Sequence, residues 1–381
     1  MPGLQEFLDA YVRKGVLLGS VAVLARGDRL EVAVAGSAHA DGSAPMRRDS
    51  IFRLASLTKA VTAAALLMLV DDGRVTLDQP VDGWLPELAD RRVLRTPASP
   101  LDEVVAAVRP ITVFDLLTSQ AGLGWAADSE LPFVRALFPI QRDGREPLSY
   151  PSADEWMAEL GQLPLLGQPG EFWLYDTCST VQGILVARVC GQSLPEFLAQ
   201  RIFEPLGMDD SGFTVAQGKR DRFTSYYRNT PEGFELADGP DGQWAGEPPL
   251  PLGHGGLVGT ADDVLKFHRM LLADGVGADG KRLLSTESVR LMHTDHTTPA
   301  SRALAGFFLD GQGWGCGGSV DIAVRGPWNA PGRYGWVGGT GTSAYHVPAT
   351  GAIDIVLTQV AVDSPVPAEW LEDFWRFAAQ S

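Results

Sequence analysis

Ala-Ser-Leu-Thr-Lys-Ala-Val-Thr-Ala-Ala-Ala-Leu-Leu-Met-Leu-Val, residues 55–70, predicts a helix that begins near Ser56 and is apolar on every face. A helix with that pattern is buried in a core instead of lying on a surface. Ser56 and Lys59 stand three positions apart, so their side chains share one face of the helix and can meet. The stretch therefore places a serine hydroxyl beside a lysine amine at the head of a buried helix.

A serine becomes a nucleophile when a neighbouring base can take its proton, and Lys59 has the spacing for that task. Because burial of an ammonium group is unfavourable, we expect Lys59 to be paired with an opposite charge or to be partly neutral. The alternative is that Ser56 caps the helix and Lys59 extends to water. A Ser-x-x-Lys pattern is short enough to occur by chance, so the surrounding sequence has to separate the two interpretations.

The two ends of the chain have an α/β pattern, and the middle has a helical one. Residues 4–14 have helical spacing and precede two alternating segments, 20–25 and 30–36, that predict a hairpin. Near the other end, 343–347 and 353–360 predict a second pair of strands before a closing helix at 368–379. Between the ends, further helices are predicted over residues 56–72, 113–119, 153–160, 179–189, 194–202, 261–273 and 286–293.

Composition narrows the classes of function. The 381 residues include 45% hydrophobic ones, enough for a sizeable core, and the formal net charge is −16. That charge would repel nucleic acids and anionic membrane surfaces. The longest nearly apolar run, residues 60–70, is too short to span a membrane, and the first residues lack the pattern of a secretion signal. We therefore expect a cytoplasmic globular protein with no nucleic-acid partner and no membrane span.

The cysteines and histidines give no metal or disulfide pattern. Cys178, Cys190 and Cys316 are too few and too scattered for a disulfide framework, so we expect free thiols. His293 and His296 form a His-x-x-His pair without the helical context or third ligand of a metal site. We expect them to be two surface histidines that follow a helix.

Six sequence blocks follow one another along the chain: Ile51–Lys59, Gly73–Val81, Ile111–Ser119, Gln168–Tyr175, Arg201–Met208 and Gly255–Asp263. In this order they resemble the blocks of class C β-lactamase-like proteins, in the superfamily that also contains the penicillin-binding proteins. Such an order is hard to obtain by chance, and the resemblance covers nearly the whole sequence.

Tyr175 matches the tyrosine of the family's Tyr-x-Asn motif. The resemblance implies that this side chain, as a phenolate or as a hydrogen-bonded phenol, shuttles a proton between nucleophile and leaving group. Taken alone, Tyr175 would be read as a core tyrosine with a satisfied hydroxyl. Here the motif is Tyr175-Asp176-Thr177, so a hydroxyl at Thr177 replaces the amide that helps β-lactamases to hold an acylamino side chain. This replacement weakens a lactam or peptide interpretation.

The family's third element, Lys-Thr-Gly or His-x-Gly, corresponds here to Trp336-Val337-Gly338. An indole offers an apolar wall and one donor where a β-lactamase has a cation for the substrate carboxylate. This departure, together with Gly313-Trp314-Gly315-Cys316-Gly317, resembles the family VIII carboxylesterases. The same correspondence implies an oxyanion hole made by the backbone N–H groups of Ser56 and Gly339. The glycines at 338 and 339 let the backbone approach the acyl carbon.

The resemblance implies an α/β (α+β) protein with the β-lactamase-like fold, an antiparallel sheet flanked by helices with an inserted all-helical domain. We expect residues 1–70 and 285–381 to form a discontinuous α/β domain and 71–284 a mainly helical one, with the active site in the cleft between them. The sequence 341–345 lacks the closing glycine of a Gly-x-Ser-x-Gly elbow, which leaves an α/β-hydrolase fold without support.

The function that the resemblance implies is hydrolysis of a small carboxylic ester through a Ser56 acyl-enzyme. Lys59 and Tyr175 would move the proton, and no metal or organic cofactor is implied. Four activities on the same scaffold stay open: acyltransferase, amidase, β-lactamase and D-amino-acid peptidase. A non-catalytic binding or sensor domain is a further alternative, against which stands the presence of Ser56, Lys59 and Tyr175 together. The sequence gives no prediction of oligomeric state.

Overall fold

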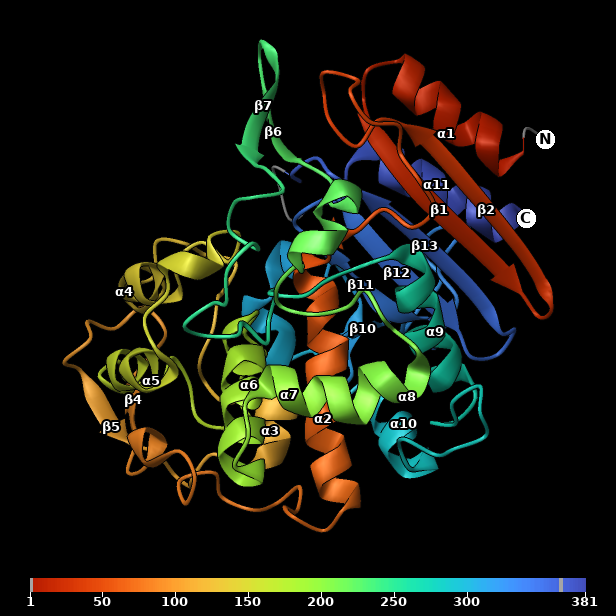
Figure 1. The fold of residues 1–381 in the computed structure, drawn as a ribbon. Coiled ribbons are helices and arrows are strands. Elements are labelled where there is room, and N and C mark those ends of the chain that lie inside the picture. Colours follow the sequence, from red (N-terminus) through yellow and green to blue (C-terminus); the bar gives the residue numbers. More distant parts are fainter. Residues whose placement is uncertain (1–2, 363–365) are drawn as a thin grey trace.

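A seven-stranded antiparallel sheet forms the largest layer of the protein, a computed structural model of which describes residues 3–362 and 366–381 (Figure 1). The strand order is β2-β1-β13-β12-β11-β10-β9, so segments from the two ends of the chain lie side by side, one strand in from an edge of the sheet, where β1 pairs with β13. The strands are β1 (Gly19–Arg26), β2 (Arg29–Gly36), β9 (Gly313–Trp314), β10 (Ser319–Val320), β11 (Tyr334–Gly338), β12 (Thr342–Val347) and β13 (Ala352–Thr358).

Both faces of the sheet are buried, because alternate residues of its central strands enter two different cores. Ala22 and Leu24 of β1 pack with α1 (Leu4–Arg13) and α11 (Glu369–Gln380), which cover one face. Val21 and Val23 belong to the larger core on the other face, which contains α2 (Thr58–Asp71). The N- and C-termini lie on the same side of the molecule, beside α1 and α11 (Figure 1).

The helix predicted from residues 55–70 runs through the larger core. A 3₁₀ turn, Ala55–Leu57, leads into α2, whose residues are nearly all buried. Neighbouring helices and short strand pairs complete this half of the molecule: α3 (Val113–Leu117), α4 (Pro132–Gln141), α5 (Ala153–Gly161), α6 (Thr177–Cys190), α7 (Leu194–Leu198), α8 (Glu204–Leu206), α9 (Ala261–Leu272), α10 (Thr286–His293), β3 (Phe52–Arg53) with β8 (Val258–Gly259), β4 (Arg92–Leu94) with β5 (Val104–Ala106), and β6 (Tyr226–Thr230) with β7 (Gly233–Asp238).

The fold class predicted from the sequence is confirmed, with three differences in detail. The helix α4 was not predicted, since Pro139 interrupts its pattern. The helix expected at 194–202 is a short α-helix followed by a π-helical turn at 199–203. In addition, α9 lies in the range expected for the helical domain, yet it packs against β1, β12 and β13. The division into two domains remains a proposal, and one continuous hydrophobic core joins the sheet to the helices.

Candidate active site

Ser56 lies in the 3₁₀ turn before α2, at a point where the backbone is unusual. Ala55 has a φ of 46°, in the left-handed region that residues other than glycine seldom adopt. Two hydrogen bonds hold this segment against the sheet: Thr342 Oγ1 donates to the carbonyl of Leu54 at 3.0 Å, and Thr340 Oγ1 donates to that of Arg53 at 2.6 Å. The turn between β11 and β12 is thereby fixed beside the serine.

Lys59 follows one turn later and is fully buried. Its Nζ donates to Ser56 Oγ at 2.8 Å and to the backbone carbonyl of His254 at 2.7 Å. The carboxylate of Asp176 lies 2.6 Å from the same nitrogen. Lys59 is thus paired with an opposite charge, which is one of the two states expected from the sequence.

Tyr175 approaches Ser56 from the other side of the site. Its segment is held in place by backbone hydrogen bonds in both directions with Trp125, each 2.9 Å long. The phenol oxygen is 2.9 Å from Ser56 Oγ, and it accepts the indole N–H of Trp336 at 2.9 Å. Phe308 stacks on the tyrosine ring, with centroids 4.8 Å apart. The phenol is therefore fixed in position by aromatic packing and by a hydrogen bond.

Trp336 lies on β11 and uses its one donor on Tyr175, which leaves an apolar ring facing the site. Gly338, two residues later, packs closely: a Cβ there would lie 2.7 Å from the carbonyl oxygen of Leu54. A Cβ on Gly339 would meet nothing within 4 Å, and this residue lines the pocket. Only the first glycine is thus required by packing, while the second leaves space for a ligand.

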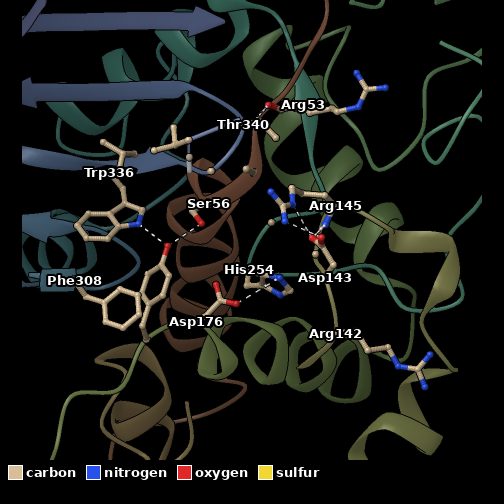
Figure 2. A pocket seen from close by; sticks show the side chains of 18 of the residues that line it. Arg53, Ser56, Arg142, Asp143, Arg145, Asp176, His254, Phe308, Trp336 and Thr340 are labelled. Atoms are coloured by element: carbon tan, nitrogen blue, oxygen red, sulfur yellow. Dashed lines mark hydrogen bonds and ion pairs between the residues drawn. The ribbon is translucent and has the colours of Figure 1, made fainter. Parts of the chain in front are cut away.

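A cavity of about 690 Å³ opens over Ser56. Figure 2 shows Phe308 and Trp336 on one side of the serine, and Asp143 and Arg145 on the other. The guanidinium of Arg145 forms an ion pair with Asp143 at 2.8 Å. The site therefore has one aromatic wall and one polar wall.

Asp176 and His254 were not predicted as site residues, although both line the cavity (Figure 2). Burial by itself raises the pKa of Asp176, but His254 and Lys59, with the hydrogen bonds from Lys59 and Gln141, bring it below its usual value. Burial lowers the pKa of His254 to about 4. The signal in the sequence was the buried Lys59, which needs a counter-ion, and the acidic residue directly after Tyr175.

Thr177, which takes the place of the substrate-holding asparagine of the family motif and was therefore expected at the substrate site, is buried at the start of α6 and does not line the cavity. Its hydroxyl donates to Gln141 Oε1 at 3.0 Å. The structure therefore brings together Ser56, Lys59, Tyr175 and Trp336, and leaves Thr177 behind the cavity wall.

The remaining expectations concern cysteines and metals. The three cysteines are free thiols, as predicted. The prediction of two surface histidines is wrong, because His293 and His296 are both partly buried and hydrogen-bonded, to His346 and to the carbonyl of Leu291. In the described ranges, no three His, Cys, Asp or Glu side chains group in a way that could hold a metal ion. Within the same residues, the structure has no helix with the length and apolarity needed to cross a bilayer.

Comparisons with known proteins show the family of the chain. The Beta-lactamase family model matches residues 4–373. Protein Rv1367c of Mycobacterium tuberculosis is 37% identical, over 96% of this chain and 90% of its own length. Esterase EstB of Burkholderia gladioli is 32% identical, over 94% and 90%. Among solved structures, EstCE1, a hydrolase with promiscuous acyltransferase activity, superposes with a TM-score of 0.82 at 24% identity, covering 99% of this chain and 97% of that one. The chain belongs to the beta-lactamase family, whose fold carries hydrolases and acyltransferases, and within it resembles the family VIII esterases.

Proposed function

We propose that the protein is a serine hydrolase that cleaves carboxylic esters through an acyl-enzyme on Ser56, with Lys59 and Tyr175 serving the proton transfers. One observation carries the proposal: Ser56 Oγ lies 2.8 Å from Lys59 Nζ and 2.9 Å from the phenol oxygen of Tyr175. Both distances are within hydrogen-bond reach, which a nucleophile and its proton acceptor require. The hydroxyl also borders a cavity large enough for a small-molecule ester.

The reaction has two steps. In the first, Ser56 Oγ attacks the ester carbonyl, its proton passes to the neighbouring groups, and the alcohol leaves with a proton. The backbone N–H groups of Ser56 and Gly339 would hold the developing oxyanion, an interaction whose loss typically lowers the rate about 10²–10³-fold. In the second step, water gives one proton to the same groups and attacks the acyl carbon. The acid is released and Ser56 is regenerated.

Esters are favoured over β-lactams because of Trp336. Its indole packs against Tyr175, which stacks on Phe308, and its N–H donates to the phenol oxygen, so this wall offers no cation for a lactam carboxylate. The likeness to Esterase EstB supports the same substrate class. Among the rival activities, hydrolysis and acyl transfer share the acyl-enzyme and differ in the acceptor that reaches it.

A substrate panel tests this proposal. Purified protein is assayed with p-nitrophenyl acetate, butyrate and octanoate, with a chromogenic cephalosporin and with a D-alanyl peptide. We expect kcat/KM for at least one ester to exceed that for the cephalosporin by about 10²-fold or more, since a missing charge partner in a binding site is costly. A higher kcat/KM on the cephalosporin would contradict the ester assignment. The Ser56→Ala variant is the control, and its rate should equal that of buffer.

A further inference from the structure

Asp176 has a backbone conformation that needs an explanation. Its φ of 83° and ψ of −64°, with Thr177 N–H donating to the carbonyl of Tyr175 at 3.1 Å, define a γ-turn with positive φ. This turn is rare and strained, and such residues persist where the surrounding structure holds them. Glycine would adopt the same backbone without strain, yet the chain has a carboxylate there. The carboxylate side chain of Asp176, which glycine would lack, is therefore the feature to be explained.

The carboxylate of Asp176 is buried and has partners on both oxygens. Oδ1 lies 2.6 Å from Lys59 Nζ, and Oδ2 accepts the amide N–H of Gln141 at 2.9 Å. The Nε2 of His254 is 3.6 Å from Oδ2. Gly144 permits this approach, because a Cβ there would lie 2.6 Å from the same imidazole nitrogen. The negative charge of Asp176 is thus held in direct contact with the Lys59 nitrogen.

Counting donors on Lys59 indicates its protonation state. The nitrogen has three close partners, Ser56 Oγ, the carbonyl of His254 and Asp176 Oδ1, and an ammonium group has three N–H bonds to give. The carbonyl and the carboxylate can only accept. A carboxylate in direct contact stabilises the ammonium over the neutral amine. All three protons of Lys59 then have acceptors, and one of them points at the serine oxygen.

With Lys59 donating to Ser56 Oγ, the serine proton has to point elsewhere. The other close neighbour of Oγ is the phenol oxygen of Tyr175, at 2.9 Å. In the first step the Ser56 O–H bond breaks and its proton goes to this oxygen, while in the same event Tyr175 gives its own proton to the alcohol oxygen, so the phenol never carries two protons. The bond between the alcohol oxygen and the acyl carbon then breaks. Tyr175 ends the step as a phenol, and Lys59 keeps its three protons.

His254 supports this arrangement without adding a second positive charge. Its Nδ1 lies 2.6 Å from Thr180 Oγ1, and its buried imidazole has a pKa of about 4, so it is neutral near pH 7. Its carbonyl also accepts from Lys59, so one residue contacts both members of the ion pair. The titratable groups around Asp176 are Lys59 on α2, His254 before β8, the chain neighbours Tyr175 and Cys178, and Tyr150, whose pKa is raised by burial and by Asp176.

We propose that Asp176 is a positioning residue that keeps Lys59 an ammonium group, so that Ser56 passes its proton to Tyr175 and Lys59 acts as a fixed positive donor. The inference rests on the proposed function and assigns separate roles to the two groups that serve the proton transfer. Asp176 acts through Lys59, to which its carboxylate is paired.

A double-mutant cycle on kcat tests the proposal, using p-nitrophenyl butyrate. Asn at 176 keeps the shape, tolerates positive φ and removes the charge. We expect Asp176→Asn to lower kcat by at least about 30-fold with KM within about 3-fold of the parent. In a Lys59→Met background the same substitution should change kcat by less than about 3-fold, because the group it acts through is gone. Equal factors in the two backgrounds would mean a structural role and would overturn the proposal.

The pH profile of kcat gives a second readout, because a substitution with a purely structural effect would not change the pH at which kcat falls. In Asp176→Asn, Lys59 lacks its counter-ion, so the alkaline limb of the kcat profile should move to lower pH. The matched control is Asp263→Asn, which removes a buried carboxylate paired with Lys266 at 3.3 Å, away from the cavity. It should lower stability and leave both kcat and the profile unchanged. Parental kcat and profile in Asp176→Asn would refute the inference.

A further variant keeps the test independent of how Asp176→Asn folds. Arginine is always charged and cannot act as a base, so Lys59→Arg should retain at least about 10-fold more kcat than Lys59→Met. Equal loss in the two variants would count against a donor role. Labelling of the parent with a fluorophosphonate distinguishes a failure of the proposed function from a failure of the proposed role of Asp176. An unlabelled Ser56 would end the proposed function itself, whereas a labelled Ser56 with parental Asp176→Asn would end only this inference.

Discussion

The phenol of Tyr175 contacts both the nucleophile Ser56 and the aromatic wall of the cavity. Its oxygen lies 2.9 Å from Ser56 Oγ and 2.9 Å from the indole nitrogen of Trp336, while its ring stacks on Phe308 and lies 4.7 Å from the ammonium of Lys59. A tyrosine with a purely structural hydroxyl would be expected to bond a backbone carbonyl, as Tyr334 does with Cys316. The contacts of Tyr175 are instead with a nucleophile and with a wall of the cavity.

Removal of the phenol oxygen should show whether Tyr175 contributes to catalysis or only to stability. We expect Tyr175→Phe to lower kcat/KM for p-nitrophenyl butyrate by at least about 10²-fold, the lower range for a positioned proton-transfer group. Its melting temperature should stay within about 3 °C of the parent, because the indole N–H that it leaves borders a cavity open to water. Ester turnover and thermal unfolding are measured on the same preparation.

The matched control is Tyr334→Phe, which removes a fully buried phenol on β11. That variant should lose about 0.5–1.5 kcal/mol of stability and keep its turnover. A Tyr175→Phe protein with parental turnover would remove Tyr175 from the mechanism.

At the scale of elements, α9, α10 and β12 meet through a row of three histidines. His268 Nδ1 lies 2.8 Å from His346 Nδ1, and His346 Nε2 lies 2.9 Å from His293 Nε2. Burial lowers the pKa of His268 to about 3 and of His293 to about 4, and it holds the pKa of His346 well below its usual value. The row is therefore uncharged in the folded protein near pH 7, and it joins two helices to the sheet through neutral hydrogen bonds.

This row should make the protein sensitive to mild acid. In the unfolded chain histidines titrate near pH 6.5. Below that pH the unfolded state therefore binds protons that the folded state does not bind. The contribution to stability is complete above about pH 6.5 and is lost as the pH falls toward 4. We expect the melting temperature to drop by about 5 °C or more between pH 7.5 and 5.0, a window above the range in which ordinary carboxylates titrate.

Replacement of the middle histidine tests this cause. His346→Gln keeps a polar group in the row and removes one titrating site, so its melting temperature should fall less over the same pH window than that of the parent. Thermal unfolding by circular dichroism at half-unit steps gives both curves. A parent curve that is flat from pH 7.5 to 5.0 would show that the row does not control acid stability.

For the whole molecule, the elements with strong periodicity were predictable and the ones held by tertiary contacts were not. The alternating pattern of β1 and β2 and the all-apolar α2 were found in the sequence because local propensity and burial agree there. The helix α4 was missed because it continues through Pro139, against its local signal. The packing of α9 on the sheet depends on contacts between distant segments, which periodicity does not encode.

The residues of the site also differ in how far the sequence alone predicts them. The Ser56–Lys59 pair was predictable since helical spacing alone brings the two side chains together. Tyr175 and Trp336 came from the resemblance to a known family, as they lie 119 and 161 residues from their partners. The role of Asp176 depends on a strained γ-turn that turns its side chain toward Lys59, and no local pattern in the sequence indicates that turn.

Covalent labelling tests whether Ser56 is the nucleophile. Purified protein is treated with a fluorophosphonate, digested, and analysed by mass spectrometry to locate the adduct, with the Ser56→Ala variant treated in parallel. We predict stoichiometric phosphonylation of Ser56, with loss of ester turnover in step with labelling and no adduct in the variant. An adduct on a different residue, or full ester turnover in a protein whose Ser56 is labelled, would show that Ser56 is not the nucleophile.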